Sequence, residues 1–162
     1  MNVGILGSGG REHAICFSIK KSKNVKNIYC LPGNAGTSAI AENIQINISD
    51  FNAIKKFTEE KKIDLLIVGP EKPLVDGIVD FFLDTKVKIF GPNQAASQLE
   101  GSKIFTKKLC EKYNIPTANF GIFQNPNESK IFLEKTNYPI VIKADGLASG
   151  KGVYICENKK DA

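Results

Sequence analysis

The sequence predicts an α/β protein in which a parallel sheet, with helices on both faces, is followed by the beginning of a second domain. Strand and helix signals alternate through roughly the first ninety residues, as expected when helices connect parallel strands. Glycine follows four of the predicted strands, and the pattern changes after Pro92. We therefore expect a first domain at residues 1–101 and a second, truncated domain at residues 102–162.

Local apolar patterns predict the first elements. The chain opens with an apolar run, the residues after it place Ala14, Ile15 and Ile19 on one helical face, and a second apolar run follows. The predicted elements are a strand at 3–6, a helix at 12–20 and a strand at 25–31.

The rest of the first domain continues the alternation. Ile44, Ile46 and Ile48 alternate with polar residues, which is typical of a half-buried third strand. Ser49 is the predicted N-cap of the next helix. That helix buries Phe51, Ile54 and Phe57, and it is followed by a continuous apolar strand at 65–68, a helix at 75–83 and a strand at 87–90.

After Pro92 the sequence reads as helices followed by two strands. Gly101 and Ser102, at the predicted domain boundary, separate the first two of these helices, and Pro116 closes the second. The predicted helices lie at 94–99, 103–113 and 128–135, and the strands, joined by a glycine-rich loop, at 139–143 and 153–156.

Composition excludes several classes of protein. The chain has 162 residues, 42% of them hydrophobic, and no apolar run approaches the roughly 18 residues that cross a bilayer. The N-terminus lacks a secretory signal, and the net charge of +5 comes from lysines scattered among acids rather than from one basic tract. We expect a cytoplasmic protein without membrane or nucleic-acid partners. The four widely spaced cysteines, expected to be reduced, are Cys16, Cys30, Cys110 and Cys156.

The first candidate site is the glycine-rich loop after the first strand, at residues 7–13. Successive backbone N–H groups at a helix N-terminus form an anion site. Arg11 is the only arginine among 22 basic residues, which indicates that its planar, fork-shaped guanidinium is needed there. We expect this loop to bind a phosphate.

A dinucleotide fingerprint is not complete in this loop. Glu12 stands where the third glycine would be, and Pro32 and Gly33, rather than an acidic residue, follow the second strand. NAD binding is therefore disfavoured. His13 is either a catalytic base or a residue that packs against or caps the helix.

Glu71 is the second candidate, because it follows the buried strand at 65–68 and the turn Gly69-Pro70. Its carboxylate lies at the sheet edge where ligands bind, and it would accept hydrogen bonds from ribose hydroxyls. Alternatively, it complements the dipole of the next helix. The local sequence leaves both interpretations open.

Lys143 and the loop after it form the third candidate. Lys143 shares a face of its strand with Val141, and the loop at 145–152 contains three glycines and Lys151. The loop differs from a Walker A loop in spacing and is followed by a strand. We interpret it as a flap that closes over nucleotide phosphates, with a simple hairpin turn as the alternative.

Five segments then occur in a familiar order: 7–14, 32–37, 68–71, 99–103 and 142–153. Together they resemble the phosphoribosylamine–glycine ligases, also called glycinamide ribonucleotide synthetases, which are ATP-grasp enzymes of purine biosynthesis. Each motif is weak alone, and five in register, covering the whole chain, are specific.

The resemblance implies a Rossmann-like pre-ATP-grasp domain followed by the start of an ATP-grasp domain. It also implies that ATP, with Mg²⁺ or Mn²⁺, phosphorylates glycine and that the amine of 5-phosphoribosylamine attacks the acyl phosphate. The products would be glycinamide ribonucleotide, ADP and phosphate. The implied protein is a cytoplasmic monomer with small-molecule partners.

The same resemblance implies roles for individual residues. The phosphoribosylamine site would use Gly9, Gly10, Arg11, Gly33, Asn34, Gly36, Thr37 and Glu71. The ATP site would use Lys103, Lys143, Gly146, Ser149, Gly150, Lys151 and Gly152. No catalytic residue is assigned, and the metal ligands are expected beyond residue 162, so these residues alone are expected not to catalyse.

Three alternatives stay open at this point. They are another ATP-grasp ligase, such as a purine or biotin carboxylase, a free-standing nucleotide-binding module, and a dehydrogenase.

Overall fold

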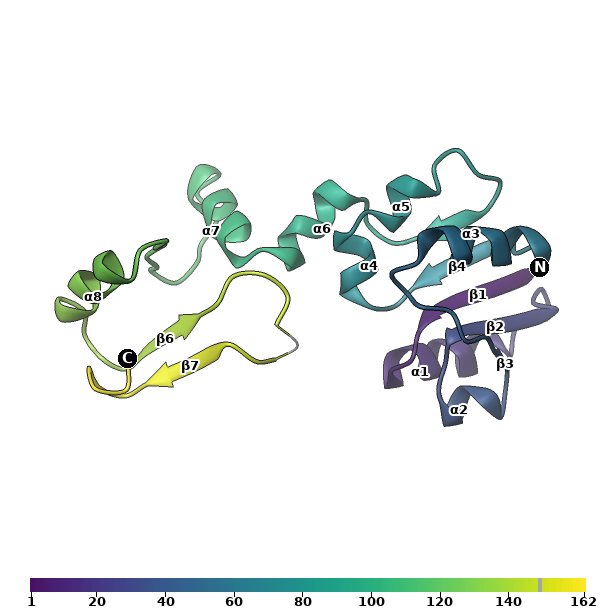
Figure 1. Ribbon diagram of the computed structural model, residues 1–162, viewed down its shortest axis with the longest axis horizontal. Coiled ribbons are helices and arrows are strands. Elements are labelled where there is room, and N and C mark those ends of the chain that lie inside the picture. Colours follow the sequence, from purple (N-terminus) through teal and green to yellow (C-terminus); the bar gives the residue numbers. More distant parts are fainter. Residues whose placement is uncertain (149) are drawn as a thin grey trace. The chain divides into compact units, whose positions relative to one another are not determined.

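The computed structural model describes residues 1–148 and 150–162, and the chain divides into two compact units, Met1–Ser97 and Gln98–Ala162. The first unit contains a parallel sheet flanked by helices, and the second contains an antiparallel strand pair with helices (Figure 1). The predicted α/β class is confirmed.

The sheet of the first unit has five parallel strands in the order β3-β2-β1-β4-β5. The chain therefore builds outward from β1 to one side and then crosses β1 to build on the other side, and the crossing point is where open α/β sheets bind ligands. The strands are β1 (Asn2–Gly7), β2 (Asn27–Pro32), β3 (Glu42–Asn43), β4 (Leu65–Val68) and β5 (Lys88–Phe90).

Helices bury both faces of this sheet. On one face Leu6 and Leu66 pack in a cluster with Ile54, and on the other Ile5 packs with Cys16. All five side chains are fully buried, so the neighbouring β1 residues Ile5 and Leu6 belong to hydrophobic cores on opposite faces of the sheet. The helices along this part of the chain are α1 (Gly10–Ile19), α2 (Ala35–Ser38), α3 (Phe51–Glu60), α4 (Glu71–Val75), α5 (Ile78–Phe81) and α6 (Gln94–Gly101), the last of which spans the boundary between the two units.

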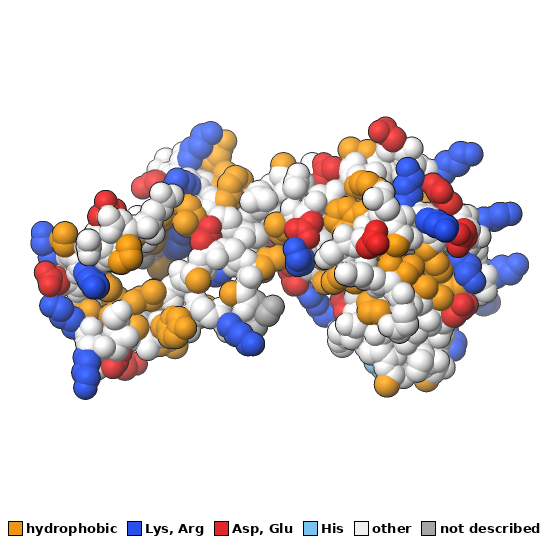
Figure 2. All heavy atoms as spheres, in the orientation of Figure 1, with side chains coloured by type: hydrophobic (Ala, Val, Ile, Leu, Met, Phe, Trp, Pro, Cys, Tyr) orange, Lys and Arg blue, Asp and Glu red, His pale blue; other side chains and the backbone are white. Residues whose placement is uncertain are grey.

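Basic and acidic side chains are mixed over the viewed face of each unit (Figure 2). This face therefore carries no single basic tract of the kind that binds nucleic acid. In the part of the chain that the structure describes, no helix combines the length and the apolarity needed to span a bilayer.

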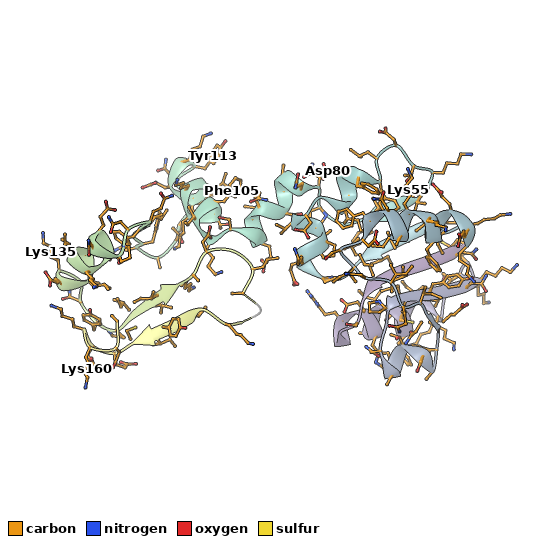
Figure 3. The ribbon with its side chains drawn as sticks, viewed as in Figure 1. Lys55, Asp80, Phe105, Tyr113, Lys135 and Lys160 are labelled. Carbon is orange, nitrogen blue, oxygen red and sulfur yellow. The ribbon has the colours of Figure 1, made fainter. Side chains whose placement is uncertain are left out.

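The second unit contains α7 (Lys103–Lys112), α8 (Pro126–Glu134) and an antiparallel pair of β6 (Ile140–Lys143) with β7 (Val153–Cys156). The predicted helices and strands are confirmed to within two residues at each end. Apolar side chains are less covered here than in the first unit. Phe105 and Tyr113 of α7, labelled in Figure 3, are 40% and 60% exposed.

The prediction of a third strand at 44–48 is wrong. The strand is limited to β3, and the three isoleucines lie in a loop whose side chains pack against the core. Ile44 N donates to Cys30 O at 2.9 Å. The next ladder bond would need an N–H from Pro32, which has none, so pairing stops there. Apolar and polar residues still alternate at 44–48 because one side of the loop faces the core.

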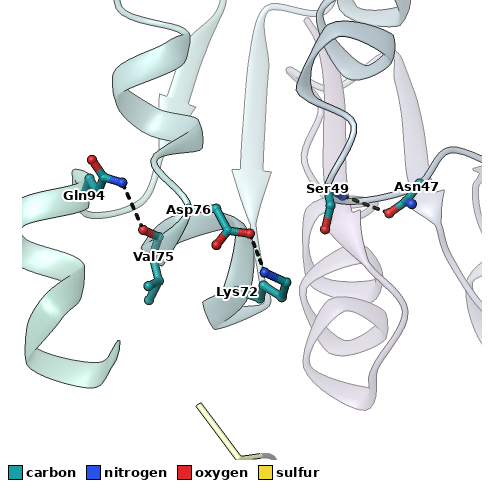
Figure 4. Close-up of polar contacts among 6 residues, drawn as sticks. All are labelled: Asn47, Ser49, Lys72, Val75, Asp76 and Gln94. Atoms are coloured by element: carbon teal, nitrogen blue, oxygen red, sulfur yellow. Dashed lines mark hydrogen bonds and ion pairs between the residues drawn. The ribbon is translucent and has the colours of Figure 1, made fainter. Parts of the chain in front are cut away.

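The predicted helix at 75–83 is also wrong, because two shorter helices, α4 and α5, occupy this region. Gly77 separates them with a φ of +92°, which a helix interior does not allow. The turn is held by side chains: Lys72 pairs with Asp76 at 2.7 Å, and Gln94 Nε2 donates to Val75 O at 3.3 Å (Figure 4).

Asp50, rather than the predicted Ser49, caps α3. The Asp50 carboxylate accepts a hydrogen bond from Ala53 N at 3.0 Å. Ser49 instead donates its backbone N–H to Asn47 Oδ1 at 3.0 Å (Figure 4). The cap therefore comes one residue later than the sequence pattern indicated.

We expect Asp50→Ala to lower the free energy of unfolding by about 1 kcal/mol, because the helix loses its side-chain cap. Ser49→Ala keeps the backbone contact to Asn47 and is expected to change stability by no more than about 0.5 kcal/mol. Urea unfolding followed by circular dichroism compares the two variants. Equal losses would contradict this assignment of the cap.

Candidate functional site

A cleft of about 410 Å³ lies at the carboxyl edge of the sheet in the first unit. Its lining comes from the loop after β1, from Pro32 at the end of β2 and from Pro70 after β4. The cleft is therefore at the topological crossing point where such folds bind ligands. Ile46, Asn47 and Ile48 complete the wall. Sequence reasoning missed their role, since it had assigned them to a strand.

Asn34 ties the first two glycine loops together. Its Nδ2 donates to Ser8 O at 2.9 Å and to Gly9 O at 3.2 Å, while its Oδ1 accepts from Thr37 N at 2.9 Å as the N-cap of α2. One amide thus fixes the loop after β1 against the loop after β2. The structure brings together the predicted residues of both loops.

Thr37 anchors Asn34 from below. The Thr37 side chain is fully buried; its Oγ1 accepts from Asn34 N at 2.7 Å and contacts Asn43 Oδ1 at 2.8 Å. Gly33 lies beside them with a φ of +74°, and a Cβ there would collide with the Asn43 side chain. Gly33 and Thr37 therefore have structural roles that place Asn34.

Glu12 is buried beneath the loop, with only 3% of the residue exposed. Its Oε2 accepts from Gly9 N, which is the half of a capping box that a glutamate at this helical position supplies. A Cβ on Gly7 or Gly69 would collide with the Glu12 side chain. Sequence reasoning saw only that Glu12 replaces a fingerprint glycine. The signal it missed was that Gly7 and Gly69, at the ends of two neighbouring strands, have no side chains and so leave room for Glu12.

Arg11 and Glu71 meet across the edge of the sheet. Arg11 Nη1 lies 2.8 Å from Glu71 Oε1, and their side chains are 63% and 40% exposed. The hydrogen bond from Arg11 holds the pKa of Glu71 below its ordinary value of 4.5, and Glu71 also opens α4 as its first residue. The structure thus shows both features that the sequence left open, a carboxylate at the ligand edge and a helix N-terminal acid.

His13 packs onto α2. A Cβ on Gly36 would lie 2.6 Å from His13 Cε1, so the imidazole covers this glycine closely. This contact supports packing rather than base catalysis. Gly10 differs, because a Cβ there would meet nothing within 4 Å.

Cys16 and Cys30 lie side by side beneath the sheet edge and are fully buried. Burial raises the pKa of Cys16 and, together with the neighbouring Cys16, raises that of Cys30 to about 12. Thiols that stay protonated are poor nucleophiles. All four cysteines are free, and these two belong to the core rather than to a site.

In the second unit, the start of α7 binds the glycine-rich loop. Lys103 Nζ donates to Gly146 O at 2.8 Å, and Asp145 accepts from Ile104 N at 3.1 Å and from Ser102 Oγ at 3.0 Å. Partial burial alone would raise the pKa of Asp145, but these hydrogen bonds outweigh it and lower the pKa. The structure therefore brings Lys103 and the loop together.

Lys143 ends β6 directly before that loop, and its residue is exposed, on the same strand face as Val141. Exposed Lys151 follows within the loop, and the structure describes no contact that joins Lys103 to Lys143. Positive φ angles occur at Gly146, Gly150 and Gly152, all between +70° and +86°. Ser149, predicted to bind ATP, lies outside the described residues.

Among the described residues, no group of three or more His, Cys, Asp or Glu side chains is placed to hold a metal ion. The cleft of the first unit offers hydrogen bonding and charge. The loop at the N-terminus of α1, Arg11 and Glu12 contribute to its lining, and Glu71 lies beside it through its ion pair with Arg11.

This arrangement defines the first unit as an open, doubly wound α/β domain with a cleft at the crossing point of its sheet. Residues 1–100 match the family model "Phosphoribosylglycinamide synthetase, N domain", and residues 101–162 match the model of that family's "ATP-grasp (A) domain". The chain belongs to the phosphoribosylglycinamide synthetase family.

Individual relatives agree with this assignment. The chain is 51% identical over 162 residues to phosphoribosylamine–glycine ligase of Mesorhizobium japonicum, with 100% of the chain covered, and 49% identical over 160 residues to that of Clostridium acetobutylicum, with 99% covered. The crystal structure of phosphoribosylamine–glycine ligase from Thermotoga maritima superposes with a TM-score of 0.77 at 35% identity, covering 99% of the chain.

The chain spans about 38% of the length of the two curated relatives and 37% of the crystallised one. The resemblance drawn from the five sequence motifs is confirmed. The family match favours this interpretation over the carboxylase, the free-standing module and the dehydrogenase.

We expect Asn34→Asp to loosen the cleft while keeping the cap of α2. Aspartate still accepts from Thr37 N, but its second oxygen faces the carbonyls of Ser8 and Gly9 instead of donating to them. The expected loss of stability is about 1 kcal/mol, with faster amide hydrogen exchange in residues 7–10.

Asn125→Asp is the matched control. Asn125 also caps a helix through its side-chain oxygen, by accepting from Asn127 N at 2.8 Å, and the structure describes no bridge from it to a second loop. Its substitution should cost little. If both variants lost the same stability, the bridge from Asn34 would contribute nothing.

Proposed function

We propose that the chain provides the phosphoribosylamine site and part of the ATP site of a phosphoribosylamine–glycine ligase. The overall reaction would join glycine to 5-phosphoribosylamine, with ATP converted to ADP and phosphate through a glycyl phosphate. The observation that carries the proposal is the pairing of an anion-binding loop with a ligand-edge cleft in a member of this family. Relatives bearing that activity extend well beyond the length of this chain.

The 5-phosphate would lie at the start of α1, close to Gly9 and on the backbone N–H of Gly10, and would bind the Arg11 guanidinium. The N–H of Gly9 itself is donated to Glu12 Oε2. A phosphate there gains from the helix dipole and from a bidentate cation. Glu71, now paired with Arg11, would be released toward the ribose hydroxyls. The predicted Gly33, Asn34, Gly36 and Thr37 would support this site by holding its walls, as their contacts indicate.

The ATP phosphates would be bound by Lys103, Lys143 and Lys151 beneath the loop at 145–152. Support comes from the match to the ATP-grasp model and from the contact between Lys103 and Gly146 O. Three loop glycines with positive φ allow backbone N–H groups to approach phosphates closely. Mg²⁺ or Mn²⁺, when bound, would offset the charge of the transferring phosphoryl group. The lysines would lower the repulsion between two anionic reactants.

We also propose that the functional domains divide between residues 101 and 102. Gly101 ends α6, and Ser102 caps α7 by accepting from Phe105 N at 3.0 Å. The family models meet between residues 100 and 101. A cytoplasmic, monomeric protein with small-molecule partners remains our expectation.

Ribose 5-phosphate is the direct probe of the proposed site. We expect the chain to bind it by isothermal titration calorimetry, and Arg11→Lys to weaken the binding by roughly tenfold, because lysine keeps the charge but not the bidentate fork. Lys56→Ala removes a positive charge from the exposed face of α3 and should leave the affinity unchanged.

Two results would contradict the proposal. One is that the unsubstituted chain binds no ribose 5-phosphate. The other is that it binds NADH in the cleft, in competition with phosphate, which would return the assignment to a dinucleotide-binding domain.

A further inference from the structure

Glu12 has a carboxylate oxygen that the fold does not use. Its Oε1 is buried, and no hydrogen-bond partner for it occurs in the described parts of the chain. Glu12 also contributes to the lining of the cleft. The unsatisfied oxygen therefore belongs to a residue that lines the cavity assigned to the phosphosugar by the proposed function, and it is buried in the wall of that cavity beside Gly69.

Helix capping accounts for only one of the two oxygens of the Glu12 carboxylate. The capping contact is made by Oε2, which accepts from Gly9 N. A capping glutamate at this helical position works equally well on the protein surface, so capping does not require 3% exposure. The structure nevertheless places Glu12 among strand and loop ends that lack side chains, at Gly7, Gly9 and Gly69.

Leaving a buried carboxylate oxygen without a donor is costly, and native proteins rarely do so without a ligand or functional reason. The ligand group that satisfies such an oxygen must carry an N–H or O–H. The phosphate group of a sugar phosphate, as its dianion, carries neither, and it would be repelled by the carboxylate. The oxygen therefore selects for the sugar end of a phosphosugar.

We propose that Glu12 is a substrate-binding residue whose Oε1 accepts a hydrogen bond from a hydroxyl or amine on the ribose of the bound phosphosugar. The inference rests on the proposed function, because it takes the phosphate to be held by the loop N–H groups and Arg11. Glu12 then reports on the sugar, and Arg11 on the phosphate. The two ends of one ligand are recognised by adjacent residues of α1 through opposite charges.

Glu12→Gln separates this role from capping. The glutamine side-chain oxygen still accepts from Gly9 N, so the helix cap is kept and thermal unfolding should shift little. In place of Oε1 the glutamine carries an NH₂ group, which is a donor and cannot accept the hydrogen bond from the ligand. We expect ribose 5-phosphate affinity to fall at least tenfold, while inorganic phosphate affinity does not fall, because the substitution removes a negative charge that repels phosphate. Lys56→Ala again serves as the surface control.

A measurement on the unsubstituted chain keeps the test independent of folding. In carbon-13 NMR, the Glu12 carboxyl resonance should move on addition of ribose 5-phosphate and stay in place with inorganic phosphate. A second titration uses phosphoribosylamine, formed in solution from ammonia and ribose 5-phosphate, to identify the donor group. If the Glu12 resonance moves further than with ribose 5-phosphate, the donor is the amine. If it moves equally, the donor is a hydroxyl.

The inference is overturned if the variant binds ribose 5-phosphate as tightly as the unsubstituted chain, or if inorganic phosphate moves the Glu12 resonance equally. Failure of the unsubstituted chain to bind either ligand would instead overturn the proposed function, and this inference with it. A normal Arg11 effect with no Glu12 effect would leave the proposed function standing and remove only the role of Glu12.

Discussion

The bridge from Asn34 to the backbone of the first loop is the interaction on which the cleft depends. Loops after neighbouring parallel strands are joined only through their strands, and glycine-rich loops have many accessible conformations. Asn34 removes that freedom by donating to Ser8 O and Gly9 O while Thr37 holds Asn34 from the buried side. A preorganised anion site needs no reordering when its ligand binds, which favours affinity.

Charge is distributed in the cleft in a way that suits a ligand with two unlike ends. Arg11 and the N-terminus of α1 favour an anion, whereas Glu71 and Glu12 favour hydrogen-bond donors. The Arg11–Glu71 ion pair is solvent-exposed, so it is weak and easily exchanged for a ligand phosphate. The same site would discriminate against free phosphate, which satisfies only one half of it.

Sequence patterns predicted the sheet and its ligand edge because a buried parallel strand such as β4 must be apolar throughout. They failed at Ile44 and Gly77, where the outcome depends on a missing N–H in a neighbouring strand and on one left-handed glycine. In the site, Arg11 was found from its glycine-rich loop, and Asn34 was found only through the family resemblance. Glu12 was missed because its burial depends on distant Gly69, a contact that only the fold creates.

The most direct test of the account is a crystal structure of this chain with ribose 5-phosphate. The account predicts the phosphate at the N-terminus of α1, on the backbone N–H of Gly10 and on the Arg11 guanidinium, with a ribose hydroxyl within hydrogen-bonding distance of a cleft carboxylate. Density for the ligand elsewhere on the molecule, or a phosphate in the cleft without contact to Arg11, would contradict it.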